Sequence, residues 1–114
     1  MTLEKAEQAL AGAEQLLKSI GVSLAKKCAE GTEISTKRLD ENQLAAYDFA
    51  WMAAELYAAQ AMRDYAKKYP EPLESGLAHY FIAETVSNLS GKVGMRAAEF
   101  GVSQAQIQAS IGSK

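Results

Sequence analysis

The sequence predicts an all-α fold, an up-down antiparallel bundle of three long helices followed by a short C-terminal helix. Three observations favour it. Alanine and leucine, both strong helix formers, supply much of the apolar content. Only two prolines interrupt 114 residues. Apolar residues also recur at helical spacing over long stretches. The length and ordinary globular composition suit a single domain over residues 1–114.

The first helix is expected over residues 3–30. Its leucines recur every seven residues, and further apolar residues follow three positions after the first three of them: Leu3, Leu10, Leu17 and Leu24, then Ala6, Ala13 and Ile20. A narrow stripe of this kind is typical of a helix that packs along a neighbour. Gly31 then provides a residue suited to ending the helix.

The second helix is expected over residues 41–69, after a polar loop at 32–39. Asp40 and Gln43 stand at the spacing of a capping box, with an acidic residue as the cap. Pro70 and Pro72 follow the last apolar positions and mark the end of the helix.

The third helix is expected over residues 72–99, and a short fourth helix over 104–111. Pro72 suits the first position of a helix, because its missing N–H has no partner there in any case. Gly91 and Gly94 weaken the second half and predict a kink. Ser103 precedes Gln106 by three residues, which is again capping-box spacing.

The second and third helices carry more apolar surface than three helices can bury among themselves. The second has a wide apolar arc, and the third has two opposed apolar faces. One face of the third holds Leu73 and four residues that we identify as interface candidates: Leu77, Tyr80, Phe81 and Met95. We therefore expect the chain to form a homo-oligomer or to bind the rest of a larger protein.

Three carboxylates lie among apolar residues on the faces of the predicted helices. Asp48 and Glu55 lie seven residues apart on the arc of the second helix, and Glu84 lies on the first face of the third. A buried carboxylate must be paired, hydrogen-bonded or protonated. We expect structural hydrogen bonds across the bundle, and a catalytic or ligand-binding role is the alternative.

Several classes of function are disfavoured by composition. The net charge of −2 and the absence of a basic stripe argue against nucleic acid. No apolar run could span a bilayer and no signal pattern begins the chain, so the expected location is cytoplasmic. A di-metal site is disfavoured because His79 is the single histidine and no glutamate precedes it by three residues. Cys28 is most simply a buried small residue.

Three segments resemble a known family. Residues 43–50 and 55–60 read QLAAYDFA and ELYAAQ, and residues 77–85 read LAHYFIAET. They resemble consecutive helices of the C-terminal helical domain of acyl-CoA dehydrogenases. The resemblance implies a four-helix domain of a flavoprotein that oxidises acyl-CoA thioesters with FAD and a catalytic glutamate.

The motifs by which that family's domain contacts flavin have no equivalent here. The resemblance therefore implies a structural or dimer-forming role, with no catalytic residue, no metal and no FAD bound by this chain alone. Residues 30–32 read Glu-Gly-Thr, which is similar to the motif that carries the catalytic glutamate in the family. In the family this motif follows the helices of the domain, whereas here it precedes two of them. The alternative function is a free-standing helical interaction protein without enzymatic activity.

Overall fold

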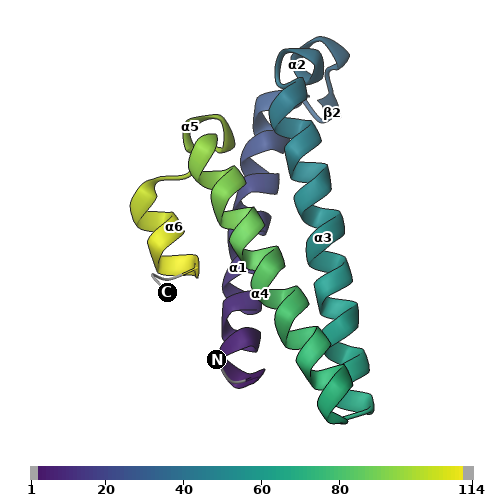
Figure 1. Ribbon diagram of the computed structural model, residues 1–114. Helices are drawn as coiled ribbons and strands as arrows, with labels where there is room; N and C mark the ends of the chain where they lie inside the picture. The colour runs from purple at the N-terminus through teal and green to yellow at the C-terminus, as the bar shows by residue number, and fades with distance from the viewer. Residues whose placement is uncertain (1–2, 112–114) are drawn as a thin grey trace.

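The computed structural model describes residues 3–111. Within that range the chain forms six helices and one two-stranded hairpin (Figure 1): α1 Leu3–Cys28, β1 Ala29–Glu30, β2 Glu33–Ile34, α2 Thr36–Glu41, α3 Gln43–Lys68, α4 Pro72–Met95, α5 Ala97–Phe100 and α6 Gln104–Ile111. The predicted all-α class is confirmed. No helix in the described range combines the length and apolar character that crossing a membrane requires.

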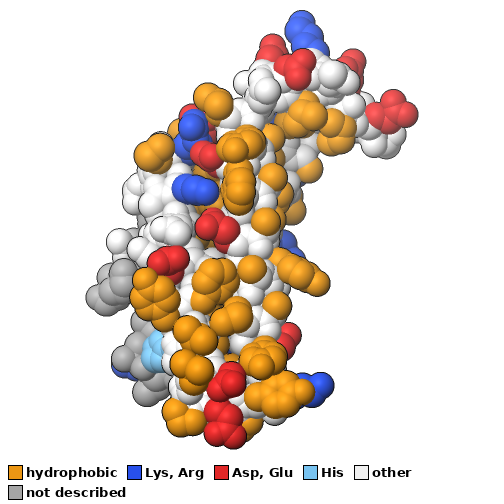
Figure 2. Space-filling model, turned by 45° about the vertical axis from the view of Figure 1, so that its right-hand side comes forward, with side chains coloured by type: hydrophobic (Ala, Val, Ile, Leu, Met, Phe, Trp, Pro, Cys, Tyr) orange, Lys and Arg blue, Asp and Glu red, His pale blue; other side chains and the backbone are white. Residues whose placement is uncertain are grey.

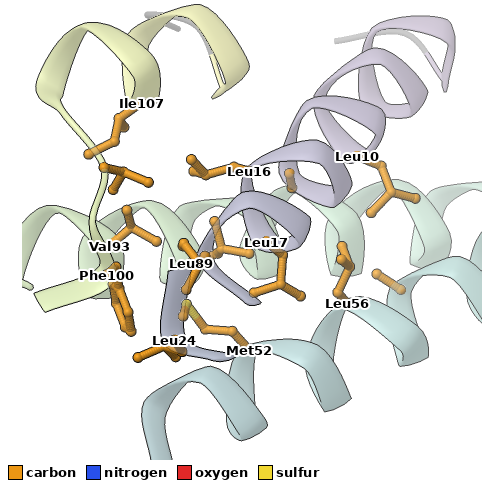
Figure 3. Packing of buried hydrophobic residues seen from close by; sticks show 14 of the residues in the cluster. Leu10, Leu16, Leu17, Leu24, Met52, Leu56, Leu89, Val93, Phe100 and Ile107 are labelled. Atoms are coloured by element: carbon orange, nitrogen blue, oxygen red, sulfur yellow. The ribbon is translucent and has the colours of Figure 1, made fainter. Parts of the chain in front are cut away.

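The core lies where α1, α3 and α4 meet, and α6 packs against α1 and α4. The leucine stripe of α1 is buried as expected at Leu10, Leu17 and Leu24. Met52 and Leu56 of α3 and Leu89 and Val93 of α4 point toward it (Figure 3), and the buried ring of Phe100 belongs to the same cluster. Burial of these side chains is the main force that holds the three long helices together.

The segment between α1 and α3 differs from the prediction. The first helix ends at Cys28 and not at residue 30, and a tight antiparallel hairpin follows, in which Gly31 has a φ of +67°. The expected loop at 32–39 holds most of α2, whose N-cap is Ser35; the hydroxyl of Ser35 accepts a hydrogen bond from the Arg38 amide at 3.3 Å. The capping box at Asp40 is therefore wrong, because the helix that contains Asp40 has already begun at Thr36.

The third long helix also ends earlier than predicted. It passes through Gly91 and Gly94 and stops at Met95, with Arg96 as its C-cap. The chain then forms the single turn of α5, which ends at Gly101 with a φ of +71°. The Val102 amide donates to the Ala97 carbonyl at 3.0 Å across this turn, a helix-ending bond pattern that requires a left-handed residue.

The C-terminal helix begins as the sequence predicts. The hydroxyl of Ser103 accepts a hydrogen bond from the amide of Gln106 at 3.1 Å, and α6 runs over Gln104–Ile111. Val102 and Ile107 are buried against the core. α6 therefore packs against both α1 and α4 (Figure 1).

Candidate functional site

One side of α3 and the residue that follows the helix present large apolar side chains to solvent. They are Leu44, Tyr47, Trp51, Tyr65 and Tyr69, each between 47 % and 65 % exposed. Ala58 lies seven residues from both Trp51 and Tyr65, so these side chains form one stripe along the helix. The rings of Tyr47 and Trp51 meet edge to face, with centroids 6.4 Å apart.

A second stripe runs along α4. It holds Leu73, Leu77, Tyr80 and Met95, which are 52–78 % exposed. We call the nine residues of the two stripes the outer face. Figure 2 shows hydrophobic side chains along most of the length of this side of the molecule, with a few acidic side chains among them.

The two stripes border each other along the line where α3 and α4 touch. Two ion pairs cross that line near the upper end in Figure 1: Arg96 Nε to Asp48 Oδ2 at 2.6 Å, and Lys92 Nζ to Glu55 Oε1 at 3.8 Å. Asp48 lies one turn beyond Leu44 and Glu55 one turn beyond Trp51, so the ion pairs form the inner edge of the α3 stripe.

The ion pairs balance the charges along this edge. Their four side chains are only 19–35 % exposed. The hydrogen bond that Asp48 accepts, with smaller contributions from the charges of Asp48 and Glu99, raises the pKa of Arg96 above its ordinary value, although burial opposes this. Arg96 therefore stays cationic, and its positive charge is matched within the chain.

The three carboxylates identified in the sequence lie in different settings. Asp48 and Glu55 are half-buried and each pairs across to α4. Glu84 is exposed, so the expectation that it is buried is wrong. It stands one turn after Tyr80 on the outer face, pointing away from the buried side chains of Ile82 and Thr85.

The four interface candidates of α4 differ in their exposure to solvent. Leu77, Tyr80 and Met95 are exposed on the outer face, whereas Phe81 is half-buried and packs against the core. The wide arc on α3 resolves into a buried side and the exposed stripe. In the sequence, the exposed side chains Leu44, Trp51 and Tyr65 are seven or fourteen residues apart. The buried side chains Ala45, Met52 and Ala59 are seven residues apart and begin one position later along the chain.

Residues considered for catalysis or metal binding do not come together. Within the described residues, no group of three or more His, Cys, Asp or Glu side chains is placed to hold a metal ion. Cys28 is buried, and Glu30 lies exposed in the hairpin, opposite Glu33 of the neighbouring strand. His79 is half-buried on α4. Cys28 is the last residue of α1 and Glu30 lies beside the turn of the hairpin, so their structural positions explain these two residues without chemistry.

Two concave surfaces lie on or beside α3. A small apolar hollow of about 260 Å³ lies on α3 between Tyr47, Ala50, Trp51 and Ala54. A larger, open groove of about 740 Å³ separates α1 from α3 on another side, and its apolar lining includes Leu17, Gly21, Val22, Phe49 and Leu56. Only the hollow adjoins the outer face.

The outer face is broad and aromatic, and the four charged side chains of the two ion pairs at its inner edge are paired with one another. Comparison of the chain with protein-family models, with curated proteins and with solved structures finds no match.

Proposed function

We propose that the chain is a structural domain that joins protein subunits, and that its outer face binds a second copy of the chain. The observation that carries the proposal is the exposure of nine large apolar side chains on one side of the molecule. At ~200 Å² for each large side chain, their exposed parts amount to on the order of 1,000 Å². A typical monomer leaves a largest apolar patch of roughly 300–600 Å².

The size of the outer face supports a protein partner. A standard stable interface buries about 800 Å² on each side. Tyrosine, tryptophan and methionine are the residues enriched at the centres of such interfaces. A second copy is favoured because the four charges of the two ion pairs beside the face cancel, so this edge of the face carries no net charge that would select a partner of opposite charge.

Sedimentation velocity at micromolar concentration tests the proposal. The expected result is a species with twice the mass of one chain. Trp51→Glu is expected to raise the dissociation constant at least ~100-fold, because burying half of a tryptophan in each copy contributes ~1.5 kcal/mol twice. A wild-type chain that remains monomeric over the whole concentration range contradicts the proposal.

Tyr57→Glu is the matched control. Tyr57 is a 75 % exposed aromatic residue of the same helix. It borders a different surface, next to Glu14 of α1 and Arg63. The substitution adds the same charge to the same helix, so association that weakens equally in both variants would count against the outer face.

The parent protein proposed for this domain is a flavoenzyme. The segments that resemble acyl-CoA dehydrogenases lie in α3 and in the middle of α4, and these two helices pack against each other. This supports a bundle similar to the C-terminal domain of that family, with a structural or subunit-joining role beside an FAD and acyl-CoA site supplied by other parts of the protein. The chain alone is then expected to bind no FAD, and a purified protein with near-stoichiometric flavin absorbance would contradict this.

A further inference from the structure

We infer that self-association through the outer face takes up protons from solvent at Glu84, so that two copies pair more tightly as the pH falls. The inference rests on the proposed self-association and adds the means by which that association is regulated. It does not depend on how the two copies are oriented, provided that the pair covers the α4 stripe.

Glu84 lies within the α4 stripe and not at its end. Leu77 comes seven residues before Glu84 and Met95 eleven residues after it, which is close to two and three whole helical turns. Tyr80 lies one turn before Glu84. Leu77, Tyr80 and Met95 are exposed, and so is Glu84. A partner that covers the stripe from Leu77 to Met95 therefore covers Glu84 as well.

The structure gives the side chain of Glu84 no ion pair and no hydrogen bond among the described residues. The basic side chains of α3 and α4, and Arg96 after α4, each lie against another group of the chain: Arg63 against Glu14 and Asp64, Lys67 against Glu7, Lys68 against the ring of Tyr69, Lys92 against Glu55, and Arg96 against Asp48. A second copy brings the same paired groups. One ammonium cannot neutralise two carboxylates, so the partner's Lys92 cannot serve both Glu55 and Glu84.

The other titratable groups around α4 supply no positive charge to Glu84. His79 is half-buried and lies five residues before Glu84, about 140° away around the helix. The segment of α6 holds no titratable side chain, and Glu99 of α5 contacts Arg96. α1 packs on the buried side of α4, away from Glu84. The remaining groups on the α3 and α4 sides of the outer face are acids and phenols: Asp48, Glu55, Glu74, Tyr47, Tyr65 and Tyr80.

A carboxylate without a counter-charge is costly to remove from water when it is ionised, and it binds a proton instead. A two-fold pair brings two such groups into one interface, and the repulsion between them favours the protonated form further. The pair is therefore expected to bind up to two more protons than two separate chains. Association of this kind strengthens as the pH falls, and it weakens as the pH rises above the value at which the covered carboxyl groups ionise.

Sedimentation velocity over a concentration series at about pH 6 and about pH 8 tests the inference. Both values lie above the isoelectric point of about 5.4, so the chain keeps a net negative charge throughout. The dissociation constant of the wild-type pair is expected to be at least ~10-fold lower at the lower pH. Glu84→Gln is expected to associate about equally at both values, because an amide takes up no proton. Glu84→Asp keeps a carboxyl group and should retain the pH dependence.

Two control variants separate Glu84 from other sources of pH dependence. Glu33→Gln makes the same change in net charge at an exposed position of the β2 strand. His79→Gln removes the single histidine, a residue type that ordinarily titrates near about pH 6.5. Both variants are expected to show the pH dependence of the wild-type chain.

The outcomes that overturn the inference differ from those that overturn the proposed function. A dimer whose dissociation constant is equal at the two pH values, or lower at the higher pH, refutes proton uptake and leaves the proposed self-association standing. A pH dependence that survives in Glu84→Gln, or disappears in His79→Gln, refutes the assignment to Glu84. Wild-type monomers at both pH values over the whole concentration range refute the self-association itself.

Discussion

Gly101 is the residue at which a single added carbon is expected to disturb the fold most sharply. It ends α5 in the left-handed region, with φ +71° and ψ +32°. A Cβ at this position would lie 2.2 Å from Oγ and 3.1 Å from Cβ of Ser23 on α1. Gly101→Ala therefore strains the backbone and also forces the C-terminal part of the chain away from α1.

The two costs can be separated by magnitude. An L-residue held in the left-handed conformation costs roughly 1–2 kcal/mol. Overpacking against Ser23 costs ~1–3 kcal/mol, because Oγ can rotate away but Cβ is fixed to the helix. We expect Gly101→Ala to lower the free energy of unfolding by about 2–5 kcal/mol. Adding Ser23→Ala removes the Oγ contact and should recover part of the overpacking and none of the backbone strain.

Urea unfolding followed by circular dichroism measures these differences, with all proteins at one concentration because association adds to apparent stability. Gly76→Ala is the matched control. Gly76 lies inside α4 with open space around it, so alanine should be neutral or stabilise by up to ~1 kcal/mol. A Gly101→Ala cost below ~0.5 kcal/mol, or one unaffected by Ser23→Ala, would refute the reasoning.

Three further predictions concern the core, the ion pair and the outer face. Leu89→Ala should lower the free energy of unfolding by ~2–5 kcal/mol because Leu89 is 1 % exposed, whereas Leu39→Ala on the surface should cost less than ~1 kcal/mol; urea titrations of both decide this. Asp48→Leu should lower the melting temperature more than Asp48→Asn, since only asparagine keeps an oxygen for Arg96, and equal shifts would show that the hydrogen bond contributes nothing. Glu84→Gln should strengthen self-association several-fold in sedimentation, because a carboxylate on the outer face loses water on pairing; unchanged association would place Glu84 outside the interface, and weaker association would show that its charge is favourable there.

The long helices follow from local sequence patterns. The leucine heptads of α1, the prolines before α4 and the Ser103 cap each depend on residues within a few turns of one another. Such signals need no knowledge of the rest of the chain. They predict the class and the three long elements, and they fix the start of α6.

The short elements depend on contacts between distant residues. The break after Met95 occurs where Arg96 reaches Asp48, which lies 48 residues earlier. The α5 turn is stabilised by Lys27, whose ammonium donates to the carbonyls of Ala98 and Glu99. The hairpin after α1 is stabilised by Arg38, which donates to the Ala29 carbonyl. No local pattern contains this information.

The outer face was predictable in part. An excess of apolar surface on the second and third helices is visible in the sequence and predicts a partner. The packing of α1 and α4 determines which residues of the α3 arc remain exposed. The sequence alone therefore does not show that Trp51 is exposed and Met52 is buried. Glu84 was expected to be buried for the same reason: its neighbours on α4 are apolar, but they are exposed with it.

Fluorescence of Trp51 tests the central claim most directly, because it is the single tryptophan and lies on the outer face. Emission is recorded as the wild-type chain is diluted from tens of micromolar to nanomolar concentration. Self-association through the outer face predicts a blue-shifted maximum at high concentration and a red shift on dilution, in one transition that Tyr80→Glu moves to higher concentration and Tyr57→Glu leaves in place. An emission maximum that stays constant while the mass changes from dimer to monomer would contradict the claim, since the copies would then meet through another surface.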